Sequence, residues 1–96
     1  MLRHIAALIA VVAMMASAAP AEPAANVKGV EVHYGDLDLS TPDGAKSMLE
    51  RIKRAAWDAC KLPPGTPVQR RCIAETVTQA VADLKAPEVT RSAYGR

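Results

Sequence analysis

The chain of 96 residues has room for one small domain. Half of its residues are hydrophobic, only 3% are aromatic and none is Phe, while 12 Lys and Arg against 10 Asp and Glu leave a net charge of +2. This near balance excludes the strongly basic surface that is typical of nucleic-acid-binding modules. We therefore expect no nucleic-acid partner.

Residues 1–21 have the three regions of a secretory signal peptide. A short basic start with Arg3 precedes an unbroken apolar run over residues 5–15 and a tail of small residues. The run is too short to cross a bilayer, which takes roughly 20 apolar residues. The pattern predicts a periplasmic or secreted protein, cleavage after Ala18 or Ala21, and a mature chain without a stable membrane span.

The segment over residues 22–29 begins with Ala, Pro and polar residues, and we predict it to be a flexible leader to a single small domain over residues 30–96. Apolar and polar residues then alternate, which places Val30, Val32 and Tyr34 on one face of a short strand. No second segment shows a convincing strand pattern. We expect this strand to pack on helices, to pair weakly with the C-terminal tail, or to add to a strand of another molecule.

A first helix is predicted to begin at about Pro42, because Thr41 is a good N-cap and proline is favoured at the first helical position. Apolar residues at helical spacing form one stripe along this helix. Its members are Ala45, Met48, Leu49, Ile52, Ala56, Ala59 and Cys60.

Two prolines and a glycine over residues 63–65 end the first helix, and Thr66 with Gln69 makes a capping box for a second helix from about Pro67 to Lys85. The apolar stripe of the second helix comprises Ile73, Thr76, Val77, Ala80 and Leu84. Two amphipathic helices joined by a short loop make an antiparallel hairpin. The predicted fold class is mainly α, a disulfide-tied helical hairpin preceded by one short β-strand.

The two cysteines, Cys60 and Cys72, are predicted to form a disulfide, since export places them in an oxidising compartment. Closing a loop of this size stabilises a small domain by about 3 kcal/mol in the entropic model. Their separation excludes a C-x-x-C redox motif, and His33, the single histidine of the mature chain, is too few for a four-ligand zinc site. Free thiols and a metal site are the alternatives.

The run from Val32 to Pro42, which contains Tyr34-Gly35-Asp36, resembles the UrcA family of small exported bacterial proteins. Gly44-Ala45, Leu49, Arg51-Ile52, Ala55-Ala56 and the two cysteines extend the resemblance over about residues 30–89. The resemblance implies export, small size and paired cysteines. It transfers no site, because the family has no assigned activity.

Asp36 and Asp38 are the candidate metal ligands, because alternate residues of an extended segment point to the same side. Glu31 or Asp43 could join them, but two carboxylates fall short of the six to eight oxygens that Ca²⁺ takes. The alternative is that both carboxylates accept hydrogen bonds from backbone N–H groups in the connection from strand to helix. We predict no cofactor.

Trp57 lies at the rim of the first helix's stripe, where Lys53 can cover its ring. Together with Val30, Val32 and Tyr34 it forms a candidate surface for a partner. The alternative is a rim residue that shields the disulfide.

The chain offers no arrangement of nucleophile, base and orienting group, so we do not expect an enzyme. The favoured function is an exported binding or interaction module of the bacterial cell envelope, with a protein or envelope partner or with self-association through the strand. The alternative is a metal-binding or envelope-stress protein that acts through Asp36 and Asp38.

Overall fold

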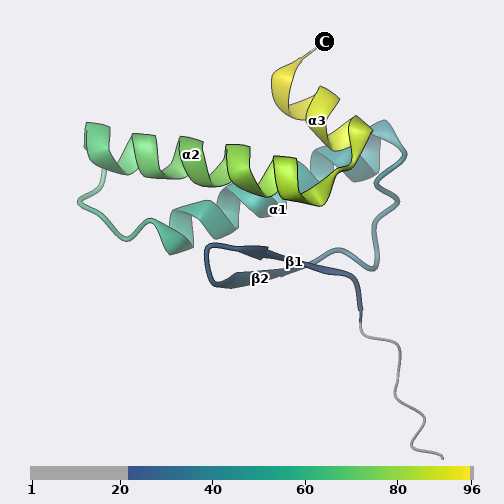
Figure 1. Ribbon diagram of the computed structural model, residues 1–96, viewed down its shortest axis with the longest axis horizontal. Helices are drawn as coiled ribbons and strands as arrows, with labels where there is room; N and C mark the ends of the chain where they lie inside the picture. Colours follow the sequence, from purple (N-terminus) through teal and green to yellow (C-terminus); the bar gives the residue numbers. More distant parts are fainter. Residues whose placement is uncertain (1–21, 96) are drawn as a thin grey trace, which may run out of the picture.

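The computed structural model describes residues 22–95, and the predicted signal peptide lies outside them. The elements in chain order are β1 (Ala24–Val27), β2 (Val30–His33), α1 (Pro42–Ala59), α2 (Pro67–Leu84) and α3 (Pro87–Tyr94). Helices α1 and α2 lie antiparallel, with the two strands on one side of the pair and α3 on the other (Figure 1). The predicted fold class, mainly helical with a disulfide between the two long helices, is confirmed.

The prediction of a flexible leader over residues 22–29 is wrong, because this segment contributes a strand. β1 pairs antiparallel with β2, and Val27 lies opposite Val30. Lys28 and Gly29 connect the strands with φ angles of 50° and 87°, the positive values that a type I′ turn requires. The predicted strand therefore has its partner within the chain.

The alternative pairing with the C-terminal tail is wrong as well, because that tail is helical. α3 begins with Pro87 at its first turn and ends at Gly95, which has a φ of 73°. A glycine in this left-handed conformation is a common helix end.

Both long helices begin at the predicted caps. The Thr41 hydroxyl accepts a hydrogen bond from the Gly44 amide at 3.1 Å, and the Thr66 hydroxyl accepts one from the Gln69 amide at 3.2 Å. The side chain of Gln69 departs from the predicted capping box, because its oxygen accepts from the amide of Gly65 at 2.9 Å. The loop before α2 is thus held by the first turn of the helix that it precedes.

The core lies between the helix pair, the strands and α3, and it is small because many of its members are alanines. The largest fully buried side chains are Met48, Ile52, Val27, Val81, Val89 and Cys60. Val27 belongs to β1 and Val89 to α3, so both of these short elements contribute to the core. Burying a side chain of this size stabilises the fold by about 1.5 to 3 kcal/mol.

Candidate binding surface

The disulfide between Cys60 and Cys72 joins the C-cap of α1 to the second turn of α2, with 5.9 Å between the two Cα atoms. Cys60 is buried, and its Sγ lies 3.6 Å from the hydroxyl of Thr76. The bond closes the loop end of the helix pair, as predicted. Its position among core residues gives it a structural role.

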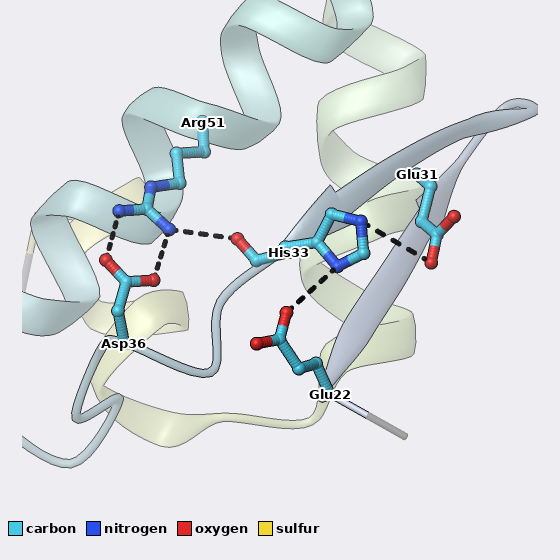
Figure 2. Close-up of polar contacts among 5 residues, drawn as sticks. All are labelled: Glu22, Glu31, His33, Asp36 and Arg51. Atoms are coloured by element: carbon cyan, nitrogen blue, oxygen red, sulfur yellow. Dashed lines mark hydrogen bonds and ion pairs between the residues drawn. The ribbon is translucent and has the colours of Figure 1, made fainter. Parts of the chain in front are cut away.

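Both carboxylate oxygens of Asp36, a predicted candidate metal ligand, accept hydrogen bonds from Arg51 of α1. The two terminal guanidinium nitrogens of Arg51 donate to Asp36 at 2.7 Å each, and one of them also donates to the carbonyl of His33 at 2.9 Å (Figure 2). These hydrogen bonds lower the pKa of Asp36 to about 2. The contact ties the connection after β2 to the middle of α1.

Asp38 has a different and local role. One of its carboxylate oxygens accepts hydrogen bonds from both the amide and the hydroxyl of Ser40, and these bonds lower the pKa of Asp38. Its backbone carbonyl accepts from the Thr41 hydroxyl at 2.8 Å. The alternative in which the carboxylates satisfy backbone N–H groups is therefore correct for Asp38, whereas Asp36 pairs with a side chain that sequence reasoning did not connect to it.

His33 lies at the exposed edge of β2 between two carboxylates. Its Nδ1 is 3.8 Å from Glu22 and its Nε2 is 3.7 Å from Glu31 (Figure 2). Within residues 22–95, no group of three or more His, Cys, Asp and Glu side chains gathers in a way that could hold a metal ion.

The predicted partner surface does not exist as one patch, because its residues lie on different sides of the molecule. Val30, Val32 and Tyr34 pack against the core, and Val32 is only 6% exposed. Trp57 is 54% exposed and lines a groove to which neither strand contributes. Of the four residues, the structure therefore leaves only Trp57 available as a large exposed contact.

The groove around Trp57 lies between the second half of α1 and the first half of α2. It encloses about 300 Å³ and is lined by Lys53, Trp57, Arg70, Ile73, Ala74 and Val77. Its lining is mostly apolar, with one cation contributed by each helix. Sequence reasoning assigned Ile73 and Val77 to the buried stripe of α2, but both are only partly buried.

A larger hollow of about 350 Å³ lies between β1 and α2. Its lining includes Lys28, Glu75 and Asp83, so charges of both signs face it. The ammonium of Lys28 is 3.5 Å from the sulfur of Cys72. This mixed lining offers no single ligand chemistry, whereas the Trp57 groove does.

Comparison with protein families, with characterised proteins and with solved structures finds no match for this chain. No helix within residues 22–95 is both long enough and apolar enough to span a bilayer.

Proposed function

We propose that the protein is an exported, non-enzymatic binding module of the bacterial cell envelope and that the groove around Trp57 is its binding surface. The observation that carries this proposal is a tryptophan that is 54% exposed above an apolar groove in a chain with only three aromatic residues. Large aromatic side chains left in water next to other apolar groups are typical of contact surfaces.

Export is supported by the signal-like residues 1–21 and by a disulfide that suits an oxidising compartment. The resemblance to the UrcA family is part of the same proposal. A binding role at the groove, in preference to a metal site at Asp36 and Asp38, is supported by the structural hydrogen bonds of these two carboxylates. Mass spectrometry of the protein from the envelope fraction tests export, with a mature chain beginning at Ala19 or Glu22 as the expected result.

Site-specific photocrosslinking in the producing cell tests the binding surface. A photoreactive residue at Ala74, which is exposed in the groove, should give a discrete crosslinked product. The matched control places the photoreactive residue at Glu75. Glu75 is the next residue of α2 and is also exposed, but it lies on the side of α2 that faces the strands. Equal labelling from both positions, or none from either, would contradict a binding role for the groove.

A further inference from the structure

The groove belongs to the side of the helix pair that faces away from the strands. On α1, Arg54 and Asp58 line a hollow shared with β2, whereas Lys53 and Trp57 do not. On α2, Glu75 and five other residues share a hollow with β1, whereas the groove residues do not. Figure 1 shows α3 on this same side, above the end of the pair that is remote from the α1–α2 loop. The groove is therefore the half of this side that α3 leaves open.

α3 shows what this side of the helix pair accepts. It is an eight-residue amphipathic helix that buries Val89 completely and packs Ala93 against the core. Thr90, Arg91 and Ser92, on its other side, remain exposed. A short helix that presents one apolar stripe is thus sufficient to cover half of this face, and Trp57 and Ile73 provide an apolar floor on the other half.

The rim of the groove selects for negative charge. Lys53 stands on α1 and Arg70 on α2, and none of the described residues that line the groove is acidic. Arg70 is held in place because its guanidinium donates to the carbonyl of Gly65 at 2.7 Å, which leaves further N–H groups for a partner. Carboxylates beside an apolar stripe would complement this rim.

A second copy of the chain does not fit these charges. A two-fold contact places the same patch of both copies together, so Lys53 and Arg70 of one copy would meet the same cations of the other. Like charges brought together at an interface oppose association.

We propose that the groove binds a short amphipathic helix of another protein, whose apolar stripe lies on Trp57, Ile73 and Val77 and whose flanking Asp or Glu side chains pair with Lys53 and Arg70. This inference rests on the proposed binding function and names its partner class. A helix is favoured over a lipid surface because the site is a groove between two helices, the shape that accepts the side-chain ridge of a third helix. α3 is already seated in this manner on the neighbouring half.

Trp57 is the single tryptophan of the chain, so its fluorescence reports directly on the groove. The probes are three synthetic peptides of equal length: one with a leucine stripe flanked by Glu, one with the same stripe flanked by Lys, and a scrambled Glu peptide without a stripe. The acidic amphipathic peptide should shift Trp57 emission to the blue and bind about tenfold more tightly than the Lys peptide at low salt, because ion pairs replace like-charge contacts.

Lys53→Glu should reduce or reverse the preference for the acidic peptide. The matched control, Arg54→Glu, makes the same charge change at the next position of α1. Arg54 lies on the side of α1 that faces β2, so this substitution should leave the preference unchanged. Equal effects of the two substitutions, or equal binding of the scrambled Glu peptide, would show non-specific charge attraction and would overturn the proposal.

Vesicles of phosphatidylglycerol provide the other arm of the test. If Trp57 emission shifts to the blue with these vesicles but with none of the three peptides, the groove binds a lipid surface and the proposed helix partner is wrong. Specific crosslinks from Ala74 without peptide binding would contradict the acidic helix while leaving the groove as a binding surface. The absence of both crosslinks and peptide binding would remove the proposed function as well.

Discussion

Individual residues near the strand-to-helix connection show where sequence reasoning fails. Asp36 and Asp38 were expected to point to the same side because alternate residues of an extended chain do so. The chain instead turns at Gly35–Asp36 and again at Leu39–Ser40, and these turns send the two carboxylates to different partners. Arg51 is 15 positions from Asp36, so nothing local in the sequence connects them.

The Asp36–Arg51 pair predicts a dependence of stability on pH. The pKa of Asp36 falls from its ordinary 3.8 to about 2 in the folded chain because Arg51 hydrogen-bonds the charged form. A lowered folded-state pKa contributes stability that is present above pH 3.8 and is lost as the pH falls through about 2. Asp36→Asn should therefore lower the melting temperature at pH 7 and make little difference at pH 2.

Thermal melts monitored by circular dichroism at several pH values measure this difference. Asp58→Asn is the control, since Asp58 is an exposed carboxylate on the same helix as Arg51. A deficit for Asp36→Asn of the same size at pH 2 as at pH 7 would show that the Asn side chain, and not the lost charge, is responsible.

Replacement of Gly44 by alanine should destabilise the protein, although helix propensity alone predicts a gain in stability. Gly44 lies in the first turn of α1, where alanine is normally better than glycine by about 1 kcal/mol. A Cβ at this position would collide with the backbone carbonyl of Asp38, and backbone cannot move aside as a flexible side chain can. Gly44→Ala should therefore lower the free energy of unfolding by about 1 to 3 kcal/mol.

Urea denaturation measures this change, and Ser47→Ala is the control at an exposed position one turn later in α1. The control should change the free energy of unfolding by less than about 0.5 kcal/mol. A stabilised Gly44→Ala variant would mean that the approach of Asp38 to α1 is not as close as the structure shows.

Among the elements, the helices were predictable and the first strand was not. Apolar spacing and caps at Thr41 and Thr66 locate both long helices, because these signals are local. β1 consists of Ala-Ala-Asn-Val, and alanine and asparagine are poor strand formers. The available signal was the spacing of Val27 and Val30, which are three residues apart. In one continuous strand this odd separation would put the two side chains on opposite faces. In a β-hairpin with a two-residue turn the two residues lie opposite each other, so their side chains share one face.

The hairpin turn predicts a stabilising substitution. Lys28 has a φ of 50°, which costs an ordinary residue about 1 kcal/mol, whereas Asn-Gly is the preferred pair for a type I′ turn. Lys28→Asn should raise the free energy of unfolding by up to about 1 kcal/mol. The lost contact of the Lys28 ammonium with the Cys72 sulfur is minor because sulfur is a weak acceptor.

Urea denaturation again gives the measurement, and Gly29→Ala serves as the opposing variant because its φ of 87° disfavours any side chain. Gly29→Ala should be destabilising while Lys28→Asn is stabilising. Two changes of the same sign would not agree with a turn that needs positive φ at both positions.

At the scale of the whole molecule, an amphipathic stripe shows that a helix face is apolar but not what covers it. Val81 and Val77 lie four residues apart on α2, yet Val81 is buried and Val77 is only partly buried. Only the placement of α3, which depends on contacts distant in the sequence, separates the covered half of the face from the open half. This is why the sequence placed Lys53 beside Trp57 but assigned Ile73 and Val77 to the buried stripe.

The pairing of β2 also bears on assembly. The expectation of self-association depended on a strand without a partner, and β1 supplies that partner. In the observed register, the Tyr34 amide donates to the carbonyl of Pro23 at 3.0 Å, so the alternation of an antiparallel ladder directs the amides of Val30 and Val32 toward β1 as well. The amides of Glu31 and His33 point to the outer edge of β2.

That outer edge is short and partly blocked, so we predict that the mature protein is a monomer at high micromolar concentration. Arg51 donates to the carbonyl of His33, which removes one acceptor that a second copy would need to extend the sheet. Hydrogen exchange measured with light scattering on the same sample tests this prediction. The amides of Val30 and Val32 should be protected while those of Glu31 and His33 exchange faster. A dimer that extends the sheet would protect all four, because its added strand would pair with the outward-facing amides.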